Sequence, residues 1–143
     1  GVEKFDIQYQ TISSKAMRSN KYRDDDDRWD LREQIINELL DQKQLADDDK
    51  IRLTKGGALP KGPVKSKKQA FILIGLPASG KSTIASEISK RYGAIILDSD
   101  YAKRKLPEYN NHTYGASLVH EESSQITFGF SANPRKLKSL YEH

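Results

Sequence analysis

The sequence predicts an α/β fold, a parallel sheet with flanking helices, preceded by an N-terminal helical segment. Two apolar runs, residues 70–74 and 94–97, have the continuous hydrophobicity of strands that are buried on both faces. Between them, apolar residues recur at helical spacing over 84–92, and Gly93 stands where helices commonly end. A strand, a helix and a second strand within about 30 residues form the βαβ unit of a parallel sheet.

The N-terminal helical segment is predicted from an acidic run that precedes an apolar stripe. Residues 1–23 are polar and weakly periodic, which indicates an irregular arm. Four aspartates at 24–27 then lead into a stripe that predicts a helix over 28–43. The stripe consists of Trp29, Ile35, Ile36, Leu39 and Leu40. The aspartates fit a solvated helix start better than a cation site, because the alternating ligands of a calcium loop are missing.

Composition divides the chain into three parts. Residues 1–49 hold the arm and the acidic helix, residues 50–68 form a basic linker with Gly and Pro, and residues 69–143 form the core. Charge follows a similar division, since residues 1–50 hold 9 Lys/Arg and 13 Asp/Glu while the rest of the chain holds 15 and 7. The basic part suits an anionic ligand, either a nucleotide phosphate or a nucleic acid.

The core continues beyond the second strand with one more predicted helix. Gly115 and the asparagines before it break the chain ahead of a helix over 116–127. At about 30 residues per βαβ unit, residues 70–143 supply little more than two strands. We therefore expect the sheet to be incomplete in this sequence.

Several classes of protein are disfavoured by what the sequence lacks. It has no cysteine, which excludes disulfides, thiolate zinc sites and cysteine nucleophiles. His112, His120 and His143 lack the spacing of metal ligands. There is no apolar run of about 18 residues and no leader peptide, so we expect a soluble, cytoplasmic protein without a membrane partner.

A phosphate-binding motif stands between the first strand and its helix. The residues G-L-P-A-S-G-K-S at 75–82 match G-x-x-x-x-G-K-[S/T] completely. Its glycines let backbone N–H groups point at phosphate oxygens, Lys81 reaches the β and γ phosphates, and Ser82 offers its hydroxyl to Mg²⁺. The predicted nucleotide-binding residues are Gly75, Leu76, Pro77, Ala78, Ser79, Gly80, Lys81, Ser82 and Thr83. The motif predicts binding of ATP with Mg²⁺ and a P-loop kinase-like fold.

Two carboxylates follow the second strand, at the edge of the sheet where α/β proteins bind ligands. These are Asp98 and Asp100. One could hold the metal or its waters, and the other could accept a proton from an acceptor hydroxyl. The alternative is that either one caps a short helix over 101–105.

Charged residues farther along could face the same cleft. The basic run Lys103, Arg104 and Lys105 follows the carboxylates by about one helical turn and could neutralise substrate phosphates, or it could form a solvated face. His120, Glu121 and Glu122 on the predicted third helix are further candidates, with a solvated helix surface as the alternative.

Together these residues resemble the zeta toxin family of bacterial P-loop kinases. The matching pieces are residues 71–82, residues 95–100, Lys103, residues 106–109 and the pair His120–Glu121. The resemblance implies an ATP-dependent kinase that phosphorylates a hydroxyl of a nucleotide sugar, typically UDP-N-acetylglucosamine. It further implies Asp100 as the catalytic general base, beside catalytic Lys81.

The resemblance also implies roles on the acceptor side of the site. Lys103 would be a basic residue there, and Glu121 would contact the acceptor. With Asp98 and His120 from the residue-level argument, these complete the predicted acceptor-binding set.

Two other functions stay open at this stage. The basic residues of 50–68 would suit a kinase that acts on another nucleotide or on a nucleic-acid end. A non-catalytic nucleotide-binding module is the third reading, in which the helix over 28–43 docks onto an antitoxin protein or a second copy of the chain.

Overall fold

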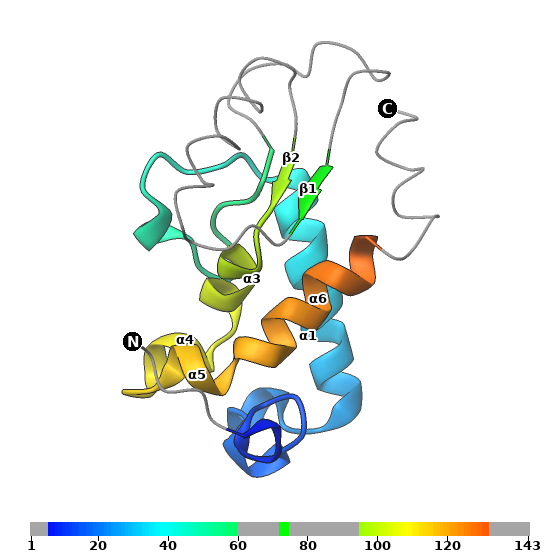
Figure 1. Cartoon of the computed structure of the whole chain (residues 1–143), viewed down its shortest axis with the longest axis vertical. Helices are drawn as coiled ribbons and strands as arrows, with labels where there is room; N and C mark the ends of the chain where they lie inside the picture. Colours follow the sequence, from blue (N-terminus) through cyan, green and yellow to red (C-terminus); the bar gives the residue numbers. More distant parts are fainter. Residues whose placement is uncertain (1–5, 60–71, 75–94, 132–143) are drawn as a thin grey trace.

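The computed structural model describes residues 6–59, 72–74 and 95–131 (Figure 1). Its α-helices are α1 (Asp25–Asp41), α3 (Ser99–Lys105), α4 (Glu108–Asn111), α5 (Gly115–Leu118) and α6 (His120–Ser131). Its strands are β1 (Ile72–Ile74) and β2 (Ile95–Leu97), and its 3₁₀ helices are Ile7–Tyr9, Lys15–Met17, Asn20–Tyr22 and Asp48–Lys50. In the described part of the chain, no helix has the length and apolar character needed to cross a membrane.

The two strands lie side by side and run in parallel, with Ile72 opposite Ile95 and Ile74 opposite Leu97. They fall within the runs expected at 70–74 and 94–97. The helix expected between them lies outside the described residues, so the wider parallel sheet stays a prediction. Because the strands are parallel and in register, both end at the same edge.

Helix α1 begins three residues earlier than the sequence predicted. Asp24 has the extended backbone of an N-cap residue, and the next three aspartates occupy the first helical turn. Carboxylates are favourable there because they face the positive end of the helix dipole. The helix ends at Asp41, two residues before the predicted end, where Gln42 turns to an extended conformation.

The buried face of α1 differs from the predicted stripe at one position. Leu31, Ile35 and Leu39 are buried as a helical face requires. Trp29 is 63% exposed, and the guanidinium of Arg32 stacks on its ring at 4.7 Å from the centroid. Trp29 is therefore not a core residue, since its position lies off the face that carries the buried residues.

The hydrophobic core joins α1 to the elements that follow β2. Figure 1 shows α6 crossing α1, with α3 beside them. The core residues are Leu31, Ile35, Leu39, Ile51, Ala58, Ile95, Leu97, Tyr101, Ala102, Leu106, Leu118, Val119 and Ile126. The division at residues 49 and 69 stays a prediction, while this one cluster takes side chains from all three parts.

Residues 51–59, which the sequence assigned to a basic linker, are packed against the end of α1. Ile51 and Ala58 are 2% and 1% exposed. Ala58 N–H donates to Leu39 C=O at 2.7 Å, and Gly57 N–H donates to Lys43 C=O at 3.0 Å. The segment thus supplies a backbone donor to the Leu39 carbonyl in the last turn of α1, where helices leave carbonyls without internal partners, and a second donor to Lys43 just after the helix. Residues 60–68 lie outside the described residues.

Gly57→Ala should lower the free energy of unfolding by about 1–3 kcal/mol. A Cβ at Gly57 would lie 2.1 Å from Gln42 C=O and 2.4 Å from Glu38 C=O, and backbone atoms cannot move aside as a flexible side chain can. Urea denaturation monitored by circular dichroism measures the change. The matched control is Gly129→Ala in α6, where nothing lies within 4 Å of the new Cβ and stability should rise by up to ~1 kcal/mol. Equal effects of the two variants would contradict this packing.

The helix predicted over 116–127 is in fact two helices, α5 and α6, with a break at Val119. The backbone N–H and the hydroxyl of Thr11 both donate to Leu118 C=O, at 2.9 and 3.2 Å. A continuous helix would use this carbonyl for the N–H of the residue four positions later. The N-terminal segment therefore competes for the carbonyl at which the helix is interrupted.

A buried ionic network ties α1 to α4 and α6. Arg28, Glu108 and Glu122 are 2%, 0% and 0% exposed. Arg28 Nη2 lies 2.8 Å from Glu108 Oε1 and 2.6 Å from Glu122 Oε1, and Arg32 Nε lies 2.7 Å from Glu122 Oε2. Ser19 N–H also donates to Glu108 Oε2 at 2.8 Å. Both carboxylates are therefore paired, as buried charges must be. Glu122 thus belongs to the core, and neither the cleft nor the solvated surface expected for it from the sequence is correct.

Acid should destabilise the protein through this network. Burial alone would raise the pKa of Glu122, but the hydrogen bonds and charge of Arg28 lower it to about 2, and Glu108 is shifted in the same direction. Groups whose pKa is depressed by folding add stability above their unfolded pKa, near 4.5, and lose it as the pH falls toward 2. Urea midpoints should therefore fall between pH 5 and pH 3, and Glu122→Gln should flatten that slope. An unchanged slope in Glu122→Gln would contradict the assignment.

Candidate functional site

The candidate site lies at the edge where β1 and β2 end. Ile74 and Leu97 are opposite each other, and the phosphate-binding motif and Asp98 follow them directly in the sequence. The nine predicted nucleotide-binding residues, 75–83, lie outside the described residues, and with them catalytic Lys81 and the magnesium ligand Ser82. Their roles stay predictions. The described residues show that the strand leading into the motif ends beside the strand leading into the two carboxylates.

Asp98 caps helix α3. Its backbone is extended, and its side-chain Oδ1 accepts a hydrogen bond from Asp100 N–H at 2.9 Å. The capping role that the sequence left as an alternative is thus present at Asp98. Burial raises the pKa of this carboxyl group above its usual value, and the neighbouring charge of Asp100 adds to the effect. Its acceptor-binding role stays a prediction.

Asp100 lies in the first turn of α3 with 54% of its side chain exposed. Its Oδ1 is 3.7 Å from Lys103 Nζ, one turn farther along the helix. The carboxylate is therefore accessible from solvent at the edge where the strands end. A carboxylate within reach of a bound hydroxyl can accept its proton, and the role of Asp100 as general base stays a prediction.

The structure brings three of the predicted acceptor-side residues together across the contact between α3 and α6. Lys103 Nζ lies 3.4 Å from His120 Nδ1, and His120 Nε2 lies 4.0 Å from Glu121 Oε1. The Lys103 side chain is 16% exposed, so its ammonium group is partly withdrawn from water. Lysine carries only donors, so in a hydrogen bond between Lys103 Nζ and the imidazole the acceptor is His120 Nδ1. The result is one fixed positive charge between a carboxylate and an imidazole. Lys105 of the same basic run lies neither in the site nor on a solvated face, because it is buried and its Nζ donates to Glu38 Oε1 at 2.8 Å.

The described residues contain no group of three or more His, Asp or Glu side chains placed to hold a metal ion. Mg²⁺ commonly binds through one or two protein oxygens together with waters and substrate phosphates. The predicted magnesium ligand, Ser82, lies outside the described residues, so its role stays a prediction.

One residue of the site had no signal in the sequence. Residues 1–23 carried no predicted function, yet Gln10 Oε1 accepts a hydrogen bond from Glu121 N–H at 2.9 Å. The two residues are 111 positions apart, so no local pattern joins them.

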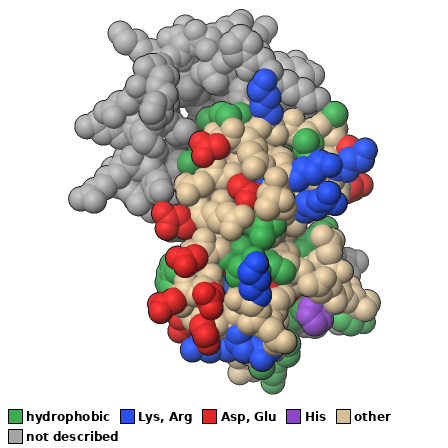
Figure 2. Space-filling view, turned by 180° about the vertical axis from the view of Figure 1, so that it is seen from behind, with side chains coloured by type: hydrophobic (Ala, Val, Ile, Leu, Met, Phe, Trp, Pro, Cys, Tyr) green, Lys and Arg blue, Asp and Glu red, His purple; other side chains and the backbone are tan. Residues whose placement is uncertain are grey.

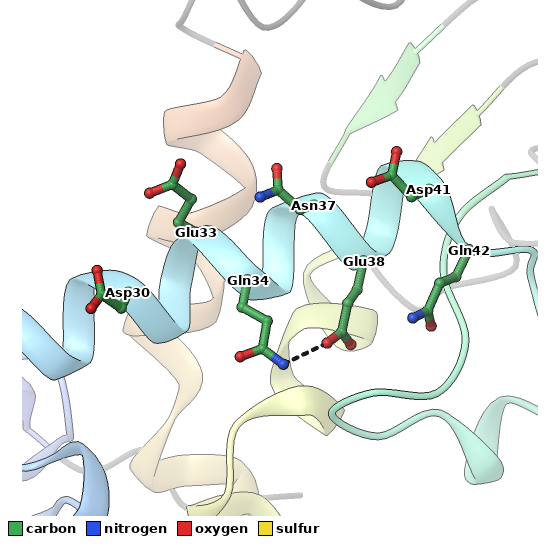
Figure 3. Close-up of a pocket in the computed structure, with 7 residues that line it drawn as sticks. All are labelled: Asp30, Glu33, Gln34, Asn37, Glu38, Asp41 and Gln42. Carbon is green, nitrogen blue, oxygen red and sulfur yellow. Dashed lines mark hydrogen bonds between the residues drawn. The ribbon is translucent and has the colours of Figure 1, made fainter.

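An open groove of about 350 Å³ runs along α1, and its lining residues are far in the sequence from the candidate site (Figure 3). It is lined by Asp30, Glu33, Gln34, Asn37, Glu38, Asp41 and Gln42. The one hydrogen bond drawn in it joins Gln34 Nε2 to Glu38 Oε2 at 2.8 Å. Figure 2 shows that acidic side chains gather along one margin of the described surface, with a group of Lys and Arg on the other. The groove contains none of the predicted site residues.

Comparison with known proteins gives one finding. A family model described as an AAA domain matches residues 71–131. The match spans the phosphate-binding motif and every described element from β1 to α6. No curated protein and no solved structure matches the chain.

Proposed function

We propose that the chain is an ATP-dependent phosphotransferase of zeta-toxin type. It transfers the γ-phosphate of Mg-ATP to a hydroxyl of a nucleotide sugar such as UDP-N-acetylglucosamine. The family-model match at residues 71–131 supports this proposal because it indicates a P-loop NTPase-like domain. The observation that carries the proposal is the complete G-x-x-x-x-G-K-S motif inside the matched region, directly after a strand that pairs in parallel with β2.

The phosphate side of the reaction depends on residues 75–83. Backbone N–H groups of the motif would bind phosphate oxygens, and Lys81 would contact the β and γ phosphates. Ser82 would hold Mg²⁺, which when bound offsets charge on the phosphate oxygens.

The acceptor side depends on Asp100 and its neighbours. The acceptor hydroxyl oxygen bonds to the γ-phosphorus, the bond from that phosphorus to the bridging oxygen breaks, and ADP leaves. Asp100 takes the hydroxyl proton as general base, for which its exposed carboxylate at the end of β2 is suited. Lys103, His120 and Glu121 would bind the acceptor, since Lys103 lies 3.7 Å from Asp100 and also contacts His120, which in turn lies next to Glu121.

Mass spectrometry of candidate acceptors tests the proposal. UDP-N-acetylglucosamine, NAD and a short oligonucleotide are each incubated with the full chain and Mg-ATP. UDP-N-acetylglucosamine should gain the mass of one phosphoryl group, and Lys81→Ala should abolish the gain. If only the oligonucleotide gained a phosphoryl group, the acceptor would be a nucleic-acid end and not a nucleotide sugar. No gain on any acceptor, with ATP binding intact, would contradict phosphotransfer and favour a non-catalytic module.

A further inference from the structure

We infer that Gln10 is a positioning residue for the acceptor side of this site. Its side-chain carbonyl holds the first turn of α6 and thereby the contact between His120 and Lys103. The expected effect of Gln10 on kinetics rests on the proposed function. Its effect on the structure of α6 can be measured without any substrate.

Helix α6 begins without a side-chain cap from the residue before it. Its first residue is His120, and the residue before it is Val119, whose side chain offers no hydrogen-bond acceptor. The first N–H groups of a helix have no partner within the helix and need one from outside. Gln10 Oε1 accepts from the N–H of Glu121, the second residue of α6, at 2.9 Å. A side chain from the N-terminal segment therefore does what an N-cap residue normally does.

The backbone around Gln10 is fixed, so the cap is held in place. Gln10 is 2% exposed, its N–H donates to Ile7 C=O, and its C=O accepts from Ser14 N–H at 2.8 Å. The next residue, Thr11, donates twice to Leu118 C=O at the junction of α5 and α6. Arg18 Nε in turn donates to Thr11 C=O at 2.7 Å. The segment is thus attached to the same junction that it caps.

The first turn of α6 is held from two sides. Glu122 is bound by Arg28 and Arg32 in the buried network, while Glu121 N–H is bound by Gln10. His120, in the same turn, meets Lys103 Nζ at 3.4 Å. Loss of the Gln10 acceptor leaves the network side intact and releases the backbone next to His120. A small displacement there changes how Lys103, His120 and Glu121 face a substrate.

Three variants at position 10 and one control isolate the cap. Gln10→Leu keeps the size of the side chain and removes the acceptor, and Gln10→Asn keeps the amide but shortens its reach. Gln10→Glu keeps an acceptor oxygen at the same distance, and the positive end of the α6 dipole stabilises its carboxylate, so this variant should restore the cap. Gln8→Leu, at an exposed position of the same segment, is the matched control.

The first readout is NMR of the full chain without substrate. Gln10→Leu and Gln10→Asn should shift the Glu121 amide and the His120 ring signals, while the His112 signals, the Gln10→Glu spectrum and the control stay close to wild type. Because Gln10→Asn retains a polar side chain, it keeps the test available if Gln10→Leu does not fold. Unchanged Glu121 and His120 signals in the folded variant would overturn the inference.

The second readout is kinetic. Gln10→Leu or Gln10→Asn should lower kcat/KM for the acceptor about 10- to 100-fold, with the Kd for Mg-ATP unchanged and activity largely restored in Gln10→Glu. A wild-type chain that phosphorylates no acceptor would refute the proposed function, while the NMR readout would still decide the role of Gln10. An active wild type with unaltered kcat/KM in both variants would refute the positioning role alone.

Discussion

Arg28→Ala should lower the free energy of unfolding by about 3–5 kcal/mol, or prevent folding altogether. Arg28 is 2% exposed and hydrogen-bonds to both Glu108 and Glu122, which are fully buried. Its removal leaves Glu108 without its arginine and Glu122 with Arg32 alone. Uncompensated buried charge is among the most costly changes a protein can undergo. Urea denaturation at neutral pH, monitored by circular dichroism, measures the loss.

The control for this prediction is an ion pair at the surface. Lys15 Nζ lies 3.3 Å from Asp25 Oδ2, and both side chains are more than half exposed. Exposed pairs contribute about 0–1 kcal/mol, so Lys15→Ala should leave the urea midpoint nearly unchanged. If Arg28→Ala were as stable as Lys15→Ala, the buried network would not support the fold in the way described.

Asp100→Asn should lower the rate of phosphoryl transfer about 10²- to 10⁴-fold while leaving Mg-ATP affinity close to wild type. Asparagine keeps the size of the side chain and cannot take the proton of the acceptor hydroxyl. The substitution does not change the backbone N–H of residue 100, which can still donate to Asp98 Oδ1. Helix α3 should therefore keep its cap. Acceptor-dependent ADP formation gives the rate, and calorimetric titration gives the affinity.

Asp49→Asn is the matched control for Asp100→Asn. Asp49 Oδ1 lies 3.1 Å from Arg104 Nη1, so this carboxylate also contacts α3, and its side chain is 84% exposed. The control should retain the wild-type rate. Retention of that rate in Asp100→Asn as well would remove Asp100 from the role of base.

The sequence was informative where structure depends on local pattern. The apolar runs located β1 and β2, and the acidic run followed by an apolar stripe located α1 to within three residues at each end. Local pattern failed where a distant segment intervened. The break between α5 and α6 depends on Thr11, 107 residues before the carbonyl that it binds, and periodicity cannot report such a contact.

Buried charge was the second limit on prediction. Arg28 and Glu122 are residue types that normally lie at the surface, and 94 positions separate them. Only the folded chain shows that each is the partner of the other. Trp29, in contrast, belongs to an apolar type and lies in solvent, because the helical position decides burial here more than hydropathy does.

The candidate site was predictable in part. The sequence spacing of Asp100 and Lys103 predicted that they lie one helical turn apart, and α3 confirms it. The contact between Lys103 and His120 could not be predicted, because it depends on how α3 packs on α6. The contact of Gln10 with Glu121 could not be predicted from the sequence, because nothing in the pattern of the polar arm distinguishes this glutamine from its neighbours.

Calorimetric titration of the full chain with Mg-ATP, beside Lys81→Ala, tests the central claim most directly. The motif predicts that the wild-type chain binds and that Lys81→Ala loses affinity about 100-fold, the effect of ~3 kcal/mol of charge-assisted hydrogen bonding to phosphate. Lys55→Ala, at an exposed lysine of the turn over 51–59, should bind as the wild type does. Absence of binding by the wild-type chain, or equal affinity in Lys81→Ala, would contradict a phosphate-binding loop at 75–82.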